Sequence, residues 1–295
     1  MEKLRLPSYG GQALMEGVLM RGGSHVAAAL RLPDGRIEIV NEKLSGIYNS
    51  RIRKIPFLRG LVVLWDALVL GTRFLTISAN AQTGDDEKIE GPTLYITLFI
   101  SLALAVLLFF LAPAALGQWL GKLFGWNAWI SNILEGIVRL LFAVVYILAI
   151  GKMPEIQRVF AYHGAEHKTI NAFEDGAELT PQIVQSYSLE HPRCGTAFLL
   201  TLILLSLVFF ASLGPLSLLW RMATRILFLP LLACIAYEYI RWTGSHLESP
   251  LVRWLIRPNL ALQRLVTKPP TLEMLEVSIA AFNAMYELEN PAPNS

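Results

Sequence analysis

Long runs of apolar residues alternate along this chain with polar segments that carry most of its charge. A helix needs roughly 20 mostly apolar residues to cross the hydrocarbon core of a bilayer. Residues 93–112 meet this requirement with no charged side chain, and residues 195–220 are also uncharged, with Gly214-Pro215 expected to end the helix. Both runs predict membrane-spanning helices.

Two further apolar runs contain charges. Residues 133–150 include Glu135 and Arg139, which are four residues apart on one helical face and should pair near the membrane edge. Residues 222–239 include Arg225, which we expect to snorkel outward, and a proline that should kink the helix. Together the four runs predict four crossings.

The segment 57–79 is apolar but interrupted by Arg59, Asp66 and Arg73. These charges favour a helix that lies in the membrane interface or packs against the bundle over one that crosses. The positions of Lys and Arg indicate the topology, because 21 of the 25 fall before the first crossing, between the second and third, or after the fourth. Basic loops stay in the cytoplasm, so we expect both termini there.

Composition agrees with a membrane protein. Of the 295 residues, 54% are hydrophobic and only 16% are charged, whereas a soluble domain usually has about 25% charged residues. The net charge of +2 does not favour nucleic acid as the main partner. Two cysteines argue against a disulfide framework, and the first 23 residues lack the apolar core of a cleaved secretory signal.

The polar segments predict a small cytoplasmic module. Residues 24–32 and 36–40 flank Pro33-Asp34-Gly35 as a β-hairpin, and residues 271–286 form an amphipathic helix capped by Thr271. The fold class is therefore mainly α, a polytopic helical membrane protein with about four transmembrane helices and a small α+β module. We divide the chain into six segments: a glycine-rich segment and hairpin (1–56), the interfacial or packed helix (57–79), two transmembrane pairs (92–150 and 196–240), a central loop (151–195) and a tail (241–295).

The central loop carries the first candidate for chemistry. A helix opened by Pro154 and closed by Gly176 contains His163, Glu166 and His167, which share one helical face. In the H-x-x-E-H pattern of some metalloproteases, two histidines hold a divalent metal and the glutamate takes a proton from water. We expect a metal here, with Glu166 as the catalytic base; the alternative is that these are ordinary surface residues.

A second cluster lies just ahead of the third crossing, where His191 and Cys194 offer an imidazole and a thiol three residues apart. Zinc suits this pair of ligands. With both clusters, four ligands would describe a closed structural site, and three with a water would describe an open catalytic one. Glu238, at the end of the fourth crossing, is a further candidate ligand, although it could equally form a structural ion pair.

The glycine-rich run at residues 10–23 lacks the lysine and the spacing of a phosphate-binding loop. It could bring Gln12, Glu16 and Arg21 to the mouth of the metal site, where Glu16 and Arg21 would act as acid, base or anion clamp. The alternative is that its glycines only shape a sharp turn.

These segments together resemble the YqhQ-like family of bacterial membrane proteins, which are predicted to be metal-dependent enzymes. The resemblance rests on residues 10–21, 162–169 and 191–196, on Tyr237-Glu238, and on the pairs at 262–263 and 276–277. It covers nearly the whole chain and implies a multi-pass protein of the bacterial cytoplasmic membrane.

We therefore expect a zinc-type hydrolase that acts on an amphiphilic or membrane-embedded substrate at the cytoplasmic face. Its partners would be the lipid bilayer and a second copy or other members of a membrane complex. The alternative from a different class is a non-enzymatic scaffold or assembly factor with a structural metal. A di-iron enzyme would need more histidines than the five present, and a transporter would need charges nearer the middle of its crossings.

Overall fold

A computed structural model describes residues 9–46, 52, 55–83 and 91–291. The chain divides into two units that interleave along the sequence. Unit 1 comprises Met1–Lys88, Gly151–Cys194 and Gln263–Ser295, and unit 2 comprises Ile89–Ile150 and Gly195–Leu262. The polar segments form unit 1 and the longest apolar runs form unit 2.

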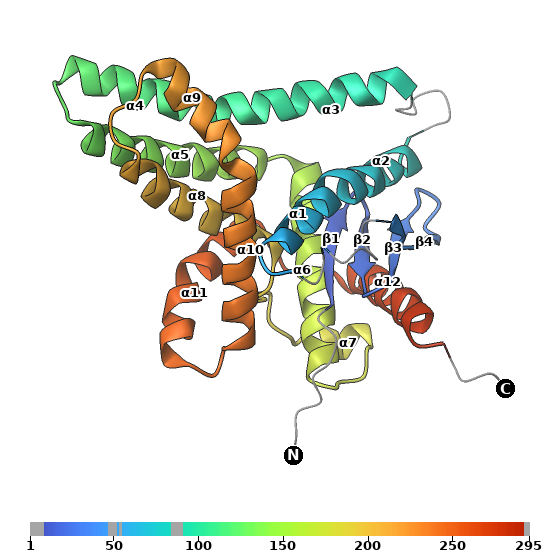
Figure 1. The fold of residues 1–295 in the computed structure, drawn as a ribbon. Helices are drawn as coiled ribbons and strands as arrows, with labels where there is room; N and C mark the ends of the chain where they lie inside the picture. Colours follow the sequence, from blue (N-terminus) through green and yellow to red (C-terminus); the bar gives the residue numbers. More distant parts are fainter. Residues whose placement is uncertain (1–8, 47–51, 53–54, 84–90, 292–295) are drawn as a thin grey trace. The chain divides into compact units, whose positions relative to one another are not determined.

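Unit 1 is built on a four-stranded antiparallel meander in the order β1-β2-β3-β4 (Figure 1). The strands are β1 (Gly10–Leu14), β2 (Gly17–Arg21), β3 (His25–Arg31) and β4 (Ile37–Lys43). The β3–β4 pairing confirms the predicted hairpin. The glycine-rich run supplies the other two strands, which the sequence did not predict as strands because glycine is a poor strand former.

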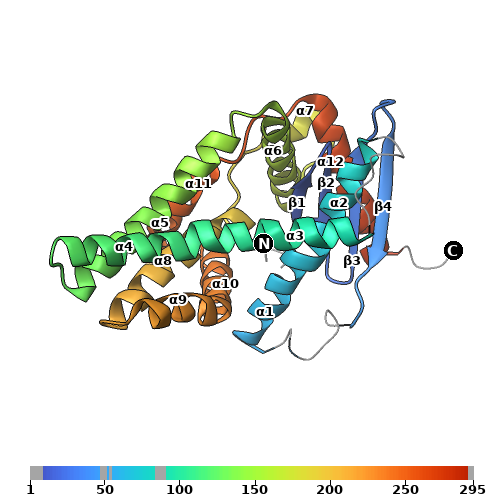
Figure 2. The ribbon, with the colours of Figure 1, turned by 90° about the horizontal axis from the view of Figure 1, so that it is seen from above.

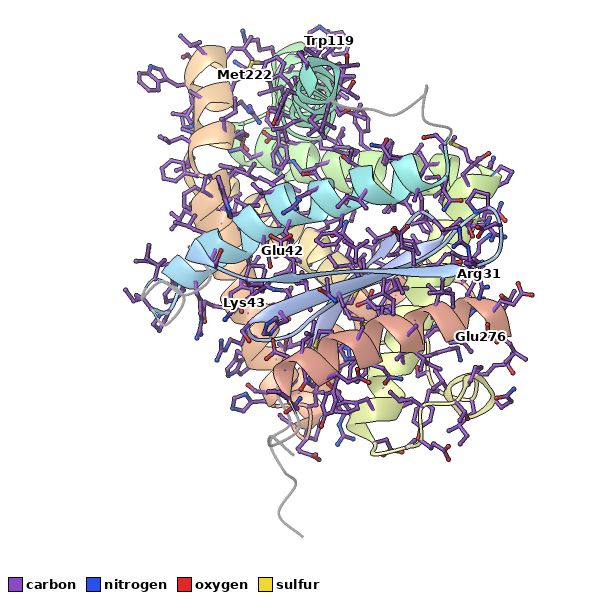
Figure 3. All side chains as sticks on the ribbon, turned by 90° about the vertical axis from the view of Figure 1, so that its right-hand side faces the viewer. Arg31, Glu42, Lys43, Trp119, Met222 and Glu276 are labelled. Carbon is purple, nitrogen blue, oxygen red and sulfur yellow. The ribbon has the colours of Figure 1, made fainter. Side chains whose placement is uncertain are left out.

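The central strands β2 and β3 are buried on both faces. Successive side chains of a strand point to opposite faces of the sheet. Val26, Ala28 and Leu30 of β3 join one apolar core, and Ala27 and Ala29 join a second core on the opposite face. The small alanines let covering helices approach closely on both sides. Unit 1 is consequently a sheet between two helical layers, which Figure 3 shows nearly edge-on.

One layer is the continuous helix 58–81, made of α1 (Leu58–Trp65), η3 (Asp66–Leu70) and α2 (Gly71–Ala81). Val62, Leu70 and Phe74 are buried, and Phe74 belongs to the core beneath the sheet. The opposite side of the helix exposes large apolar side chains, including Trp65 and Leu68. The segment predicted to be interfacial or packed thus packs on the sheet, while its length and apolar outer side also satisfy the requirements of a membrane span.

The other layer consists of α6 (Pro154–Glu174), the short α7 (Pro181–Val184) and α12 (Leu272–Glu289) (Figure 2). Both predicted helices are confirmed. The Thr271 hydroxyl accepts a hydrogen bond from the Met274 N–H at 3.3 Å, as an N-cap should. Arg31 at the end of β3 pairs with Glu276 of α12 at 3.1 Å, an exposed contact labelled in Figure 3.

All the regular secondary structure in the described residues of unit 2 is helical. Its helices are α3 (Gly91–Val106), η5 (Leu107–Leu111), α4 (Ala112–Leu123), α5 (Ala128–Ile150), α8 (Gly195–Ser212), α9 (Leu218–Leu227), α10 (Leu229–Ser245) and α11 (Pro250–Gln263). Its surface is apolar, with Phe99 72% and Val208 68% exposed. Such a surface suits a lipid environment better than water.

Four helices of the described chain are long and apolar enough to cross a membrane: Leu58–Ala81, Gly91–Leu123, Ala128–Ile150 and Gly195–Ser212. The pair α9 and α10 would be a fifth if it counts as one span bent by 44°. The bend falls beside Pro230, which confirms the predicted kink, and α8 ends before Gly214-Pro215 as expected.

The charged residues of unit 2 differ in part from expectation. Arg225 does not snorkel outward, because it is 1% exposed and donates hydrogen bonds to Glu135. The expected pair between Glu135 and Arg139 forms at 2.8 Å, but Arg139 is the central residue of α5 rather than a residue near its end. A buried arginine is strongly destabilising unless it is paired, and Glu135 supplies the carboxylate that pairs with Arg225.

Candidate metal centre

Helix α6 carries the first histidine cluster. Pro154 occupies its first turn after an extended Met153, and beyond its last residues Gly176 adopts a φ of +74° that ends the helix. His163 and His167 lie one turn apart, with ring centroids 4.4 Å apart. The helix thus points both imidazoles to the same side.

A loop folds back along this face of α6 because helix side chains bind its backbone. The Lys168 ammonium donates to the Gln185 carbonyl oxygen at 2.7 Å and also to the Tyr187 carbonyl. Asn171 donates to the carbonyl oxygens of Ser188 and Glu190, each at 3.0 Å. These four backbone acceptors fix the path of the loop that leads to His191.

Gln263 holds the far end of this loop. Its side-chain oxygen accepts from the His191 backbone N–H at 2.9 Å, and its amide nitrogen donates to the His191 carbonyl oxygen at 3.0 Å. Gln263 is 1% exposed, so both bonds are buried. A turn closed by the Cys194 N–H and the His191 carbonyl oxygen at 3.3 Å follows. Gln263 thereby positions the cysteine relative to α6.

His163, His167 and Cys194 converge, with one ligand atom of each within 4.8 Å of the others. The Nε2 of His163 lies 3.1 Å from the Sγ of Cys194. The Nδ1 atoms face backbone carbonyls, that of Val266 at 2.9 Å from His163 and that of Leu189 at 2.6 Å from His167. Carbonyls only accept hydrogen bonds, so each Nδ1 carries a proton, and Nε2 is the ring nitrogen left for a metal.

This donor set fits a zinc ion. Metal-binding histidines usually donate their second ring N–H to a carbonyl or carboxylate. The buried Nε2 of His167 has no hydrogen-bond partner among the described residues, as expected of an atom reserved for another ligand. Ligands that are each about 2.0–2.3 Å from a tetrahedral zinc lie roughly 3–4 Å from one another, so small shifts would complete the site.

Electrostatics in the cluster favour a thiolate. Burial opposes ionisation of Cys194, but the neighbouring His163 and His167 imidazoles lower its pKa well below the usual value. Burial also opposes protonation of His163, yet its hydrogen bond and charge interaction with Cys194 raise the His163 pKa to about 9. Both shifts favour the thiolate–imidazolium form of this pair. A divalent cation would replace the imidazolium proton as the partner of the thiolate.

Glu166 lies beside the cluster and is 5% exposed. Burial raises its pKa, while the nearby imidazoles of His167 and His163 act in the opposite direction. Gly11 of β1 leaves room for this side chain, because a Cβ at Gly11 would lie 3.0 Å from the Glu166 Cδ and 2.5 Å from the Leu19 carbonyl oxygen. The glycine-rich segment therefore contributes space for Glu166, because Gly11 has no side chain.

His191 lies near the three ligands without joining them. Its ring centroid is 5.7 Å from that of His167, and its buried Nε2 has no hydrogen-bond partner within the described chain. The nearest charged group is Glu174, whose Oε2 is 3.8 Å from that Nε2 and which also pairs with Arg193. Glu238 lies on α10 in unit 2 and is not one of the grouped residues.

Glu16 and Arg21 make ion pairs of their own. Glu16 forms the β1–β2 turn with a φ of +51° and accepts from Arg158 at 2.5 Å and from the Tyr162 hydroxyl at 3.2 Å. The Arg158 hydrogen bond is the main reason that the pKa of Glu16 is lowered. Arg21 pairs with Asp66 of the helix 58–81.

Sequence reasoning missed Gly11, Gln263 and the carbonyl of Val266 as parts of the site. Gln263 and the glycine run were recognised as family-like positions, but nothing in their residue types shows what they contact. A backbone carbonyl leaves no sequence signal at all, because every residue has one.

Comparison with known proteins gives a family and no activity. Residues 55–288 match the family described as "Protein of unknown function (DUF1385)". The chain is 35% identical over 301 residues to "Uncharacterized protein YqhQ" of Bacillus subtilis (strain 168), covering 96% of this chain and 93% of that protein. No solved structure matches the chain. With a family match over most of its length and a relative this similar, the chain belongs to the YqhQ-like DUF1385 family.

Proposed function

We propose that this protein is a zinc-dependent membrane hydrolase whose metal is held by His163, His167 and Cys194. The observation that carries the proposal is the convergence of these three side chains within 4.8 Å, with both Nδ1 atoms already bound to carbonyls. Three protein ligands with a free fourth position are the usual arrangement of a catalytic zinc. His191, whose ring centroid lies 5.7 Å from that of His167, would be a fourth protein ligand if it turned toward the ion.

Glu166 is the proposed general base. Burial raises its pKa above the ordinary carboxyl value, which makes it a better proton acceptor than an exposed carboxylate. A bound zinc ion would polarise a substrate carbonyl or phosphoryl oxygen and lower the pKa of a water molecule. The carboxylate of Glu166 would accept that water's proton and later donate it to the leaving group. Gly11 keeps the space for this side chain open.

The substrate is proposed to be amphiphilic or embedded in the membrane. The apolar surface of unit 2 and the exposed apolar side of the helix 58–81 support a position of the protein in or at a bilayer. The bias of Lys and Arg supports a cytoplasmic position for the loop that carries the site. A soluble substrate would not require the site to be tethered to membrane helices.

A structural metal in a non-enzymatic scaffold is the second candidate. The observation that favours it is burial, since His167 is 0% and Cys194 7% exposed. If His191 turned its free Nε2 toward the ion, the site would have four protein ligands and no place for water, as structural zinc sites do.

Metal analysis of the purified full-length protein tests the metal site. We expect near-stoichiometric zinc in the wild type. The His246→Ala control, which changes an exposed histidine at the C-terminal end of α10, should also keep its zinc. His167→Ala should lose the metal. A metal-free wild-type protein, after purification without chelators, would refute the proposal.

Glu166→Gln then separates the two candidates. The amide keeps the size of the side chain but cannot accept the proton. Zinc retained together with a null phenotype in cells would support hydrolysis, whereas zinc retained with a normal phenotype would support the scaffold.

A further inference from the structure

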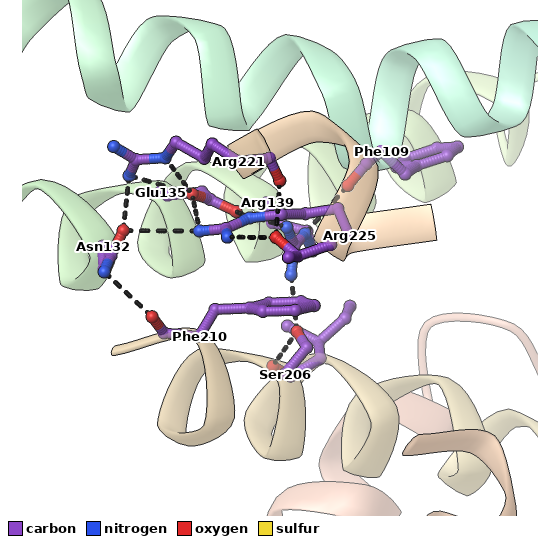
Figure 4. A network of polar contacts seen from close by, with 10 residues as sticks. Phe109, Asn132, Glu135, Arg139, Ser206, Phe210, Arg221 and Arg225 are labelled. Atoms are coloured by element: carbon purple, nitrogen blue, oxygen red, sulfur yellow. Dashed lines mark hydrogen bonds and ion pairs between the residues drawn. The ribbon is translucent and has the colours of Figure 1, made fainter. Parts of the chain in front are cut away.

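Unit 2 buries a cluster of four charged side chains that the proposed hydrolase does not use. Glu135 and Arg139 come from α5, and Arg221 and Arg225 come from α9 (Figure 4). The side chains are nearly inaccessible: Glu135 is 2%, Arg139 and Arg225 are 1%, and Arg221 is 7% exposed. Three guanidinium cations and one carboxylate leave this cluster with a net charge of +2.

The carboxylate of Glu135 is already saturated. Its Oε1 accepts from Arg139 at 2.8 Å and from Arg225 at 2.9 Å. Its Oε2 accepts from Arg225 at 2.7 Å and from two nitrogens of Arg221 at 3.0 and 3.1 Å. A carboxylate offers about four lone-pair positions, so Glu135 cannot neutralise the arginines further.

The remaining partners carry no charge, including the Phe210 ring, whose centroid lies 4.3 Å from the Arg225 guanidinium. Arg139 donates to the Ser206 hydroxyl at 2.5 Å and to the Phe109 carbonyl at 2.9 Å. The Asn132 side-chain oxygen accepts from Arg221 at 2.6 Å and from Arg225 at 3.3 Å. The positive charge of the cluster therefore stays uncompensated by the hydrogen bonds that Figure 4 marks.

Helix α9 buries its charged side chains and exposes its apolar ones, the reverse of a surface helix in water. Arg221 and Arg225 point into unit 2, whereas Leu219, Trp220 and Leu227 are 78%, 66% and 72% exposed. Buried charge without a counter-charge is unfavourable, because the ion has lost its hydration. An apolar exterior excludes the water that could otherwise screen it. A cluster with these properties should recruit an anion.

We infer that this arginine cluster binds a phosphate group at Arg221. The Nη1 of Arg221 makes no hydrogen bond within the described part of the chain, whereas its Nε and Nη2 are held by Glu135 and Asn132. Arg221 is also the most accessible of the three arginines. A guanidinium fixed on one edge offers its other edge to a phosphate oxygen with little further loss of entropy. The phosphate belongs either to a membrane phospholipid or to a dissolved anion.

Thermal unfolding of the full-length protein in dodecyl maltoside, after lipid removal, tests this site with two probes. One is dioleoyl phosphatidylglycerol, and the other is inorganic phosphate exchanged against chloride at constant ionic strength. We expect one probe to raise the unfolding midpoint saturably in the wild type. Arg221→Gln should need a roughly 10- to 100-fold higher concentration, as for the loss of a charged hydrogen bond. Arg257→Gln is the matched control, because it removes an exposed arginine of α11 in the same unit.

Each outcome decides the inference. Stabilisation by phosphatidylglycerol alone assigns a lipid headgroup, and stabilisation by inorganic phosphate assigns a dissolved anion. A wild type that responds to neither probe refutes the site, as does an equal response of Arg221→Gln. If Arg221→Gln does not fold, Arg221→Lys replaces it, since the lysine keeps the charge but loses the guanidinium edge and should also weaken the response. Metal content plays no part in this measurement, so its result is independent of the zinc proposal.

Discussion

Gln263 offers a sharp test of how the metal centre is positioned, because it touches no proposed ligand side chain. Gln263→Met keeps the shape of the side chain and removes both hydrogen bonds to the His191 backbone. Each buried backbone group left without a partner costs about 1–3 kcal/mol, so the two together should lower the stability of unit 1 by about 2–6 kcal/mol. The turn that ends at Cys194 then loses its anchor.

The effect should extend to the metal. Outer-shell substitutions typically weaken metal binding about 10- to 100-fold, and Gln263→Met should fall in this range. Competition with a chromophoric zinc chelator measures the affinity, and thermal unfolding with and without zinc measures the stability. Gln157→Met, which changes a partly exposed glutamine of α6 that donates to the Lys152 carbonyl at 3.4 Å, is the control.

The two readouts separate positioning from a general loss of structure. Loss of stability alone would mean that Gln263 only braces the loop. Zinc affinity and stability both equal to those of the Gln157→Met control would refute the reasoning.

Three further predictions follow from particular contacts. Gly11→Ala should lower the unfolding midpoint, because the new Cβ would lie 2.5 Å from the Leu19 carbonyl oxygen. Gly10→Ala is the control, since a Cβ there has nothing within 4 Å, and equal midpoints of the two variants would contradict the prediction. Glu135→Gln should destabilise the protein by about 3–5 kcal/mol in thermal unfolding, because it leaves three buried arginines without their carboxylate, while Glu248→Gln, at a carboxylate 90% exposed, should have little effect. The hydrogen bond from Arg158 lowers the pKa of Glu16 below its ordinary 4.5. The stability gained from Glu16 is therefore present above pH 4.5 and is lost as the pH falls through the lowered folded-state pKa. Unfolding midpoints of the wild type and Glu16→Gln should converge in acid, and a constant difference would argue against this pairing.

Much of the local structure could be predicted because its causes are local. Pro154 and Gly176 delimit α6, Thr271 caps α12, and Pro33-Asp34-Gly35 joins two strands. The apolar runs likewise contain helices long enough to cross a membrane, since length and composition are sufficient for that conclusion. The strands within the glycine-rich run were not predicted, because their stability comes from pairing and from the helices on both faces rather than from strand propensity.

The candidate site was predictable to the extent that it lies on one helix. The spacing of His163 and His167 fixes their common side, whatever the rest of the fold does. The approach of Cys194 depends on hydrogen bonds from Lys168, Asn171 and Gln263 to backbone atoms of a loop. The acceptors are backbone carbonyl oxygens, which every residue type has, so the sequence contains no pattern that would reveal them.

Charge within the apolar segments shows the same division. The sequence by itself determined that Glu135 and Arg139 can pair, because helical geometry places residues four apart on one face. Only the tertiary structure decided that Arg221 and Arg225 turn inward to the same carboxylate, since this requires α9 to direct its polar side toward Glu135 and its apolar side outward. Local rules of helix geometry follow from the order of residues, whereas the direction in which a charged side faces depends on what the rest of the chain places beside it.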